Sequence, residues 1–441
     1  MAVELGVFDR IWKLVGGLVR VSRSVVNKRA IESRYRFCLR QEVRSFGILG
    51  SPDIENMPVR LDEAFVSLRI SPSWRSEWSF DPAKQTDRQA AAVRSEEMHH
   101  LTPDDMMKRA FRESRVLLIV GDPGCGKTTL LKYYALCALD KKQGQLGFER
   151  QLLPLFFPLR ELAFADDGQP LSLAENLAAW SAQRSLAITA QQFNTWLVKR
   201  KTLVLLDGLD EIGDLEKRRA ACEWIKLTTN GLKNARLVVT ARWTGVRKSD
   251  CIELECEHRR ADVLDFSEEQ QQEFLKKWFP AVFMAEWRGP DMPGREWRQR
   301  QRKRGEARAG ALIDFLQQRE NRSIREFSGV PLLLQIMAIV WKERDYRPES
   351  RTALFDAALN YLLQYRDQRR GKDLKPLLDA DKARRVLGPA ALWMQERLQR
   401  DEAPKEAMHN FMQPILQTME KPPTAQDFCR NLVDRAGLIV D

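Results

Sequence analysis

The sequence predicts an α/β fold in which a parallel sheet is covered by helices on both faces. Four apolar runs of strand length, at 116–120, 153–159, 202–207 and 236–241, alternate with stretches of helical periodicity, and a shorter run follows at 261–266. These runs are apolar along their whole length rather than at every second residue. That pattern is typical of strands buried on both faces, as in parallel sheets with crossover helices.

The first 100 residues are expected to form a helical segment followed by a linker. Apolar residues recur at helical spacing within residues 1–45, at Ile11, Leu14, Val15, Leu18, Val19, Val25 and Val26. This stripe favours packing against the core or a partner. Because basic residues lie among the apolar ones, a membrane-surface helix at 7–26 is the alternative. Residues 71–100 are polar and contain two prolines, which indicates the linker.

The part of the chain after the expected sheet is predicted to be helical. From about residue 267 onward the periodicity is that of helices, and no convincing strand occurs before 437–440. We therefore expect an N-terminal helical segment with its linker at 1–100, an α/β domain at 101–270, a helical domain at 271–370 and a further, incomplete helical region at 371–441.

The composition is typical of a soluble globular protein, with 44% hydrophobic and 30% charged residues in a chain of 441. No apolar run approaches the roughly 18–20 residues that span a bilayer. Lys13, Arg20 and Arg23 interrupt any signal-peptide pattern. The seven cysteines are dispersed without CxxC spacing, which indicates reduced thiols and argues against a zinc site at Cys251 and Cys256. We expect a cytoplasmic protein with no membrane span.

Part of the net charge of +11 is concentrated in one segment. Residues 295–308 hold six arginines and one lysine against two glutamates. The simplest interpretation is a solvated loop or helix face. A patch that binds a polyanion such as nucleic acid is the alternative.

The turn after the run at 116–120 has the composition of a phosphate-binding loop. Residues 121–128 match the pattern GxxxxGK[ST], between an expected strand and an expected helix. Glycines allow successive amides to face phosphate oxygens, and the following helix adds its positive end. Lys127 can reach the β- and γ-phosphates, and the Thr128 hydroxyl can bind Mg²⁺. The expected nucleotide-binding residues are Gly121, Asp122, Pro123, Gly124, Cys125, Gly126, Lys127, Thr128 and Thr129.

Carboxylates end and follow the run at 202–207, as Mg²⁺ binding and nucleotide hydrolysis require. Asp207 ends the apolar run and is expected to hold Mg²⁺ together with Thr128. Gly208 leaves room beside the phosphates. Asp210 and Glu211 follow, where a carboxylate can orient an attacking water. The sequence therefore predicts a nucleotide-hydrolysing site with Asp207 as a metal ligand.

Arg242 directly follows the run at 236–241. Because parallel strands end at the same edge of their sheet, Arg242 is expected near the phosphate loop. There a guanidinium can contact the γ-phosphate, although a surface salt bridge is an equal alternative.

Together these stretches resemble the NACHT family, the signal-transducing P-loop ATPases of the STAND class that act as immune switches. The resemblance runs in the family's order over about 115–441. The stretches that carry it are GDPGCGKTTLLKYYA, LFFPLREL, LVLLDGLDEI, VVTAR, DVLDFSEEQQQEFLKKWF, GVPLLLQIMAIVW, RPESRTALFDAALNYLL and RAGLIVD. FGILGSPDIENMPVRLDEAFVSLRI, at 46–70, resembles the segment that often leads into NACHT modules.

The resemblance implies a role for each matching position. Asp207 matches the Mg²⁺ aspartate, Asp210 and Glu211 the hydrolytic acids, and Arg242 the first sensor. Pro331 matches the proline that packs against adenine; without the resemblance it would be interpreted as a helix start. The region 371–441 corresponds to the start of a winged-helix domain.

The resemblance further implies what the protein does. We expect an ATP/ADP and Mg²⁺-dependent switch with slow hydrolysis that self-associates on activation, in immune signalling of the bacterial antiphage type. A nucleic-acid-stimulated ATPase that uses 295–308 is the alternative, and a membrane-acting effector that uses 7–26 is a third hypothesis.

Lys127 is expected to face solvent, and the buried sheet core is expected to contain Leu117, Leu118, Ile119, Val204, Leu205, Leu206, Val238 and Val239.

Overall fold

A six-stranded sheet organises the computed structural model, with the order β1-β6-β2-β5-β4-β3. The strands are β1 (Arg69–Ser71), β2 (Val116–Val120), β3 (Leu153–Pro158), β4 (Thr202–Asp207), β5 (Ala235–Ala241) and β6 (Arg259–Leu264). The structure describes residues 30–44, 60–71, 101–212, 214–242, 246, 252–285, 294–344, 351–360, 363, 378–398 and 403–432.

The prediction of a parallel sheet is confirmed. Strands β2 to β6 pair in parallel with their neighbours, and only the edge strand β1 is antiparallel. All eight residues expected in the sheet core are buried. The shorter predicted strand, 261–266, lies two residues earlier in the chain, as β6. Strand β1 was not predicted, because a three-residue edge strand carries too little periodicity to be recognised.

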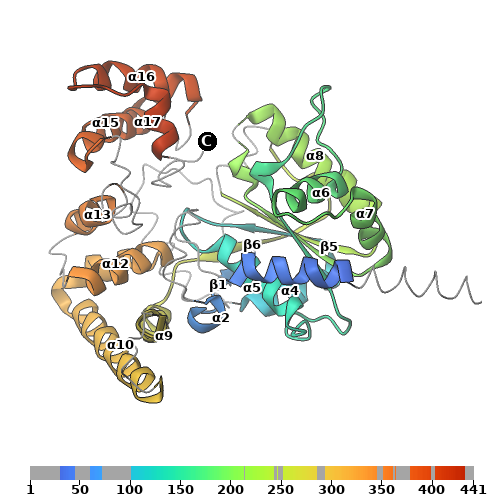
Figure 1. Cartoon of the computed structure of the whole chain (residues 1–441), viewed down its shortest axis with the longest axis horizontal. Helices are drawn as coiled ribbons and strands as arrows, with labels where there is room; N and C mark the ends of the chain where they lie inside the picture. Colours follow the sequence, from blue (N-terminus) through green and yellow to red (C-terminus); the bar gives the residue numbers. More distant parts are fainter. Residues whose placement is uncertain are drawn as a thin grey trace, which may run out of the picture.

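Right-handed crossovers place the helices on both faces of the sheet. The chain crosses from β2 to β3 through α5 (Lys127–Leu139), in the direction opposite to the steps from β3 to β4 and from β4 to β5. Helix α5 therefore covers one face, and α6 (Leu173–Gln183), α7 (Ala190–Lys199) and α8 (Leu215–Gly231) cover the other. Figure 1 shows this arrangement, with α4 (Pro103–Glu113) and α2 (Leu61–Ala64) on the side of α5.

A helix at residues 30–44 packs on the α/β core. Tyr35 is fully buried among Trp180, Phe193 and Trp196, and its hydroxyl donates a 3.2 Å hydrogen bond to the Pro154 carbonyl. The predicted apolar stripe at 11–26 lies outside the described residues. Of the predicted linker, Ser71 belongs to β1, and 72–100 lie outside the described residues.

Five helices follow the sheet: α9 (Glu268–Ala285), α10 (Gly294–Gln317), α11 (Arg322–Phe327), α12 (Pro331–Arg344) and α13 (Arg351–Asn360). The apolar faces of α9 to α12 extend the core of the sheet as far as Trp341. The basic segment 295–308 is helical, because it forms the first half of α10. Buried Gln301, Gly305 and Ala309 mark its inner face, while most of its arginines are exposed.

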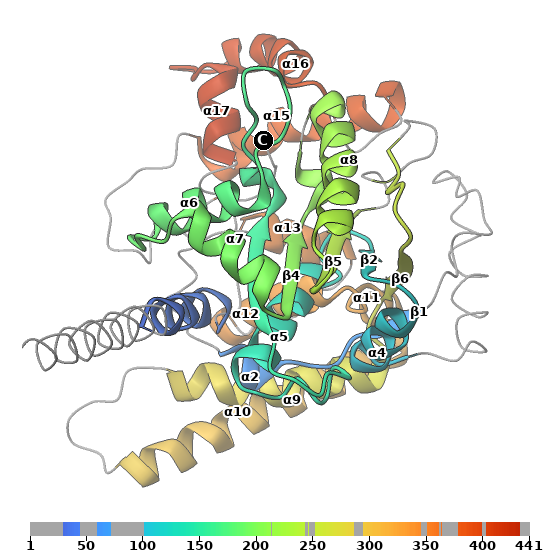
Figure 2. The ribbon, with the colours of Figure 1, turned by 90° about the vertical axis from the view of Figure 1, so that its right-hand side faces the viewer.

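The last helices have a core of their own. Apolar side chains of α15 (Ala380–Trp393), α16 (Lys405–Gln417) and α17 (Ala425–Asn431) form a cluster that shares no residue with the main core. In Figures 1 and 2 this group lies apart from the sheet. The expected strand at 437–440 lies outside the described residues.

Among the helices that the structure describes, none combines the length and the apolar content needed to cross a bilayer.

Candidate nucleotide-binding site

The phosphate-binding loop predicted from 121–128 connects β2 to α5. Gly124 and Gly126 have φ angles of 78° and 98°, in the left-handed region that favours glycine. Gly126 is the N-cap residue, so α5 begins at Lys127 with its amides at the loop. Cys125 is buried, with its Sγ under Gly121, and so contributes its backbone to the loop.

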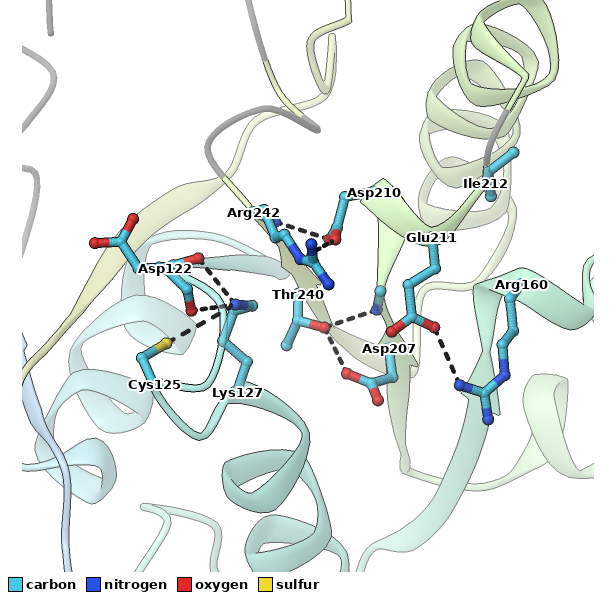
Figure 3. A network of polar contacts seen from close by, with 12 residues as sticks. Asp122, Cys125, Lys127, Arg160, Asp207, Asp210, Glu211, Ile212, Thr240 and Arg242 are labelled. Carbon is cyan, nitrogen blue, oxygen red and sulfur yellow. Dashed lines mark hydrogen bonds and ion pairs between the residues drawn. The ribbon is translucent and has the colours of Figure 1, made fainter. Parts of the chain in front are cut away.

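Lys127 does not face solvent, so that expectation is wrong. The residue is half-buried, and its Nζ donates to the carbonyls of Gly121 and Asp122 at 2.8 and 3.0 Å (Figure 3). The physical reason is that loop carbonyls left out of secondary structure need donors, and an ammonium has three. The ammonium is thereby held inside the loop.

Asp207 lies at the carboxyl end of β4, next to the loop. Its Oδ1 accepts a 2.7 Å hydrogen bond from the Thr240 hydroxyl, which in turn accepts one from the Gly208 amide at 2.8 Å. The Thr128 side chain also lies close to Asp207. Burial raises the pKa of this carboxyl. The two residues predicted to hold Mg²⁺ thus lie close together, although 79 positions separate them in the sequence.

Asp210 and Arg242 form an ion pair. The Arg242 Nε lies 2.9 Å from Asp210 Oδ2, and the Arg242 amide donates to Oδ1 at 2.8 Å (Figure 3). The Asp210 side chain is only 5% exposed. Both oxygens of Asp210 are therefore occupied, and this carboxylate positions Arg242 at the end of β5.

Glu211 has a different environment. Its side chain lies over Gly208, where a Cβ atom would come within 2.7 Å of the Glu211 Cδ. Gly208 also has a φ angle of 76°, in the left-handed region that favours glycine. Burial and the nearby Asp207 raise the pKa of Glu211 to about 7, and Arg160, at 3.2 Å, opposes this shift. A carboxyl that titrates near neutral pH is suited to general-base chemistry.

Arg218, on α8, donates hydrogen bonds to the backbone of the turn that contains Asp210 and Glu211. It is fully buried, and its guanidinium donates to the carbonyls of Ile212 and Asp210 at 2.9 and 3.0 Å. These hydrogen bonds connect the turn that follows Asp207, with Asp210 and Glu211, to α8. Arginines in helices are common, so no local signal in the sequence marks this role.

The start of α12 touches the phosphate-binding loop. The Leu332 amide donates to the Gly124 carbonyl at 3.2 Å, and a Cβ at Gly124 would lie 2.8 Å from that of Leu332. Pro331, predicted to pack against adenine, is the half-buried first residue of this helix. The structure thus brings Pro331 to the loop from more than 200 residues away.

The residues at this edge fit a nucleotide and Mg²⁺. The loop joins a glycine-rich turn to a helix N-terminus, a combination that binds phosphate. A hydroxyl and a carboxylate, from Thr128 and Asp207, are the oxygen ligands that Mg²⁺ prefers. The buried Asp207 carboxyl, with its raised pKa, is the kind of group that a cation would stabilise in its charged form.

Most of the predicted site residues meet at the carboxyl edge of the sheet. Thr240, Arg218 and Arg160 are the contacting residues that sequence reasoning missed. The segments VVTAR and LFFPLREL contain Thr240 and Arg160, so the resemblance marked their neighbourhood but not their contacts.

Residues 115–282 match the family model of the NACHT domain. A search of curated proteins gives no match. Among solved structures, a Walker-type ATPase of Pyrococcus abyssi is similar at 12% identity and TM-score 0.36, over 83% of this chain and 92% of that one. The ORC2 protein of Aeropyrum pernix in its ADP form is similar at 11% identity and TM-score 0.32, over 75% of this chain and 84% of that one. Drosophila ORC bound to DNA is similar at 14% identity and TM-score 0.27, over 87% of this chain and 91% of that one.

Proposed function

We propose, with the NACHT domain at 115–282 as the premise, that this chain is an ATP-binding, slowly hydrolysing molecular switch that self-associates on activation. The observation that carries the proposal is the placement of Asp207 and Glu211 beside a glycine-rich loop whose helix begins at Lys127. In this proposal the loop and Lys127 hold the phosphates, Thr128 and Asp207 hold Mg²⁺, and Arg242 senses the γ-phosphate. Mg²⁺, when bound, neutralises phosphate charge.

Glu211 is the proposed general base, because its pKa of about 7 lets it take a proton from water near neutral pH. Asp210 serves instead to position Arg242.

The contact between Gly124 and Leu332 supports a switch. A nucleotide in the loop would touch the same backbone that α12 touches, so occupancy of the loop can bias the position of the helices that follow. We accordingly propose the domain limits 101–270 for the NACHT domain and 271–370 for the helical domain. Region 371–441 is proposed as the start of a winged-helix domain.

The first test is nucleotide binding by Lys127→Ala. We expect Mg·ATP affinity to fall about a hundredfold or more, because a charged donor to phosphate is lost. The fold should remain intact. Calorimetry measures the affinity and circular dichroism the fold, with exposed Lys199→Ala as the matched control.

Light scattering with Mg·ATP and with Mg·ADP tests the switch itself. Growth in particle size with ATP, absent in Lys127→Ala, is the expected result. Rapid multiple-turnover hydrolysis by a stable monomer would contradict it.

Immune signalling of the bacterial antiphage type is the biological role that we propose, with residence in the cytoplasm. The resemblance to NACHT switches motivates this role. Plaque counts on bacteria that express the chain or its Lys127→Ala variant test it. Equal plaque counts for both would remove the antiphage role.

A nucleic-acid-stimulated ATPase is the second candidate, favoured by the exposed basic residues of α10. Arg295, Arg300, Arg302 and Lys303 have no ion-pair partner among the described residues. Binding to DNA or RNA should then weaken steeply with salt. Hydrolysis that does not respond to added polynucleotide would exclude this candidate.

A further inference from the structure

A cavity of about 390 Å³ lies at the sheet edge opposite the phosphate-binding loop. It is lined by the end of α4, by Ser114 and Arg115 just before β2, by the last turns of α8, by the start of β5 and by residues 255–257. The phosphate-binding loop follows the other end of β2. At about 3.3 Å per residue, a five-residue strand separates the two sites by roughly 16 Å.

Two arginines, Arg115 and Arg236, line this cavity side by side. Both are half-buried. Arg115 donates a hydrogen bond to the carbonyl of Leu232 at 3.3 Å, and Arg236 donates one to the carbonyl of Ala235 at 3.2 Å. Among the residues that the structure describes, no carboxylate lies within ion-pair distance of either guanidinium. The cavity therefore holds two positive charges that no ion pair with a described residue neutralises.

The acidic residues of the lining do not compensate this pair. Glu255 is bound to Lys226 at 2.8 Å, and Glu113 is bound to Arg259 at 2.6 Å. Glu257 is exposed and makes no ion pair with a described residue. On the cationic side, the exposed Arg112 adds a third arginine to the lining.

The two arginines oppose each other energetically. Burial lowers the pKa of Arg236, and the positive charge of Arg115 lowers it further. Since arginine does not release its proton in proteins, the repulsion persists unless an anion lies between the two groups. A guanidinium presents a planar fork of N–H donors that matches two oxygens of a phosphate.

We propose that this cavity binds a phosphorylated small molecule, with its phosphate held by Arg115 and Arg236. The volume exceeds that of a single phosphate and falls in the range of about 300–1,000 Å³ that small-molecule sites occupy. An organic group attached to the phosphate therefore has room. The exposed Asn230 amide offers a hydrogen-bonding group for it.

The experiment uses the full chain with Lys127→Ala, so that the phosphate-binding loop contributes little. Thermal unfolding is followed with increasing inorganic phosphate or ribose 5-phosphate, against chloride at equal ionic strength. We expect both oxyanions to raise the Tm saturably, ribose 5-phosphate at the lower concentration. A saturable effect of inorganic phosphate alone would overturn the assignment of an organic ligand.

Arg115→Gln with Arg236→Gln is the decisive variant. Each lost arginine should weaken the affinity for ribose 5-phosphate by about tenfold or more. Arg319→Gln, at an exposed arginine outside the cavity, is the matched control and should change nothing. An unchanged oxyanion effect in the double variant, or an equal loss in the control, would refute the site.

Misfolding of a variant is detected from its Tm in buffer that contains no oxyanion. Because Arg236→Gln removes a repulsive charge, its Tm in oxyanion-free buffer should equal or exceed that of the parent. Arg236→Lys retains the charge without the fork, so it should bind the oxyanion with intermediate affinity. Loss of all binding in Arg236→Lys together with a lowered Tm would mean that Arg236 has a structural role, against the proposal.

Discussion

Asp210 and Glu211 are neighbours in sequence with opposite surroundings. The Asp210 carboxylate is fully engaged by Arg242, whereas Glu211 lies over Gly208 beside the buried Asp207. Two adjacent acids thus have different contacts because a short 3-10 turn at 209–211 directs them to different sides. We therefore expect the titration of Glu211 to change the rate of ATP hydrolysis.

ATP hydrolysis is predicted to rise with pH through about 7. Glu211 accepts a proton only in its ionised form, and burial raises its pKa from 4.5 to about 7. Below that pH the protonated fraction grows and the rate falls. Glu211→Gln should lower the rate about 10²- to 10⁴-fold and remove the pH step, while Mg·ATP still binds. A pH–rate profile of both proteins checks this.

The same shift predicts a pH effect on stability that does not depend on catalysis. The folded pKa of Glu211 is raised, so its contribution is fully present below about pH 4.5 and is lost as pH rises through about 7. Thermal unfolding of Glu211→Gln should lack this decline. A decline of equal size in wild type and variant would mean that other groups cause it.

Arg160→Gln is predicted to move the midpoint of the pH–rate profile above that of the wild type. The guanidinium lies 3.2 Å from Glu211 and favours its ionised form, so its loss raises the pKa of Glu211 further. Because Arg160 is half-exposed, solvent and salt screen the effect. The exposed Arg150→Gln is the control, and an unmoved midpoint in Arg160→Gln would show that the ion pair is irrelevant to Glu211.

At the scale of elements, the crossing of α9 and α10 depends on one glycine. A Cβ at Gly305 would lie 2.6 Å from the backbone of Pro280, inside α9. The two helices therefore approach closely at this point. Gly310, one and a half turns further along α10, has open space instead.

The two glycines provide a matched pair of substitutions. Gly305→Ala should destabilise the chain by about 1–3 kcal/mol, because the helices must separate. Gly310→Ala should stabilise it by up to about 1 kcal/mol, because alanine is the better helix former. Urea unfolding of both variants measures the difference, and equal effects would refute the close crossing.

At the scale of the whole molecule, the described residues have two apolar cores. One spans the helix at 30–44, the sheet and the helices to α12, and the other joins α15, α16 and α17. Because the cores share no residue, damage to the second should leave the nucleotide site intact. This separation is also what a switch with movable parts requires.

Phe428→Ala tests this independence. Phe428 is 2% exposed in the second core, and its truncation should cost about 3–5 kcal/mol there. Hydrogen exchange should increase in 378–432, while the affinity for Mg·ATP stays that of the wild type. Loss of nucleotide binding together with the helices would contradict two separate cores.

The sequence by itself predicted the parallel sheet, the phosphate-binding loop and the acids that end β4. These features are encoded locally: apolar runs indicate buried strands, and glycine spacing indicates the turn. Strand β1 and the contacts of Arg160 and Arg218 escaped prediction, because a short edge strand and single arginines carry no periodic signal.

Only the tertiary structure decided which groups meet. It turned Lys127 toward its own loop, paired Asp210 with Arg242 and brought Leu332 to Gly124. It also placed Arg115 and Arg236 in one cavity, although 121 positions separate them. Local spacing determines backbone conformation, but the environment of a charge depends on groups brought close through space. That environment sets each pKa and each ion pair.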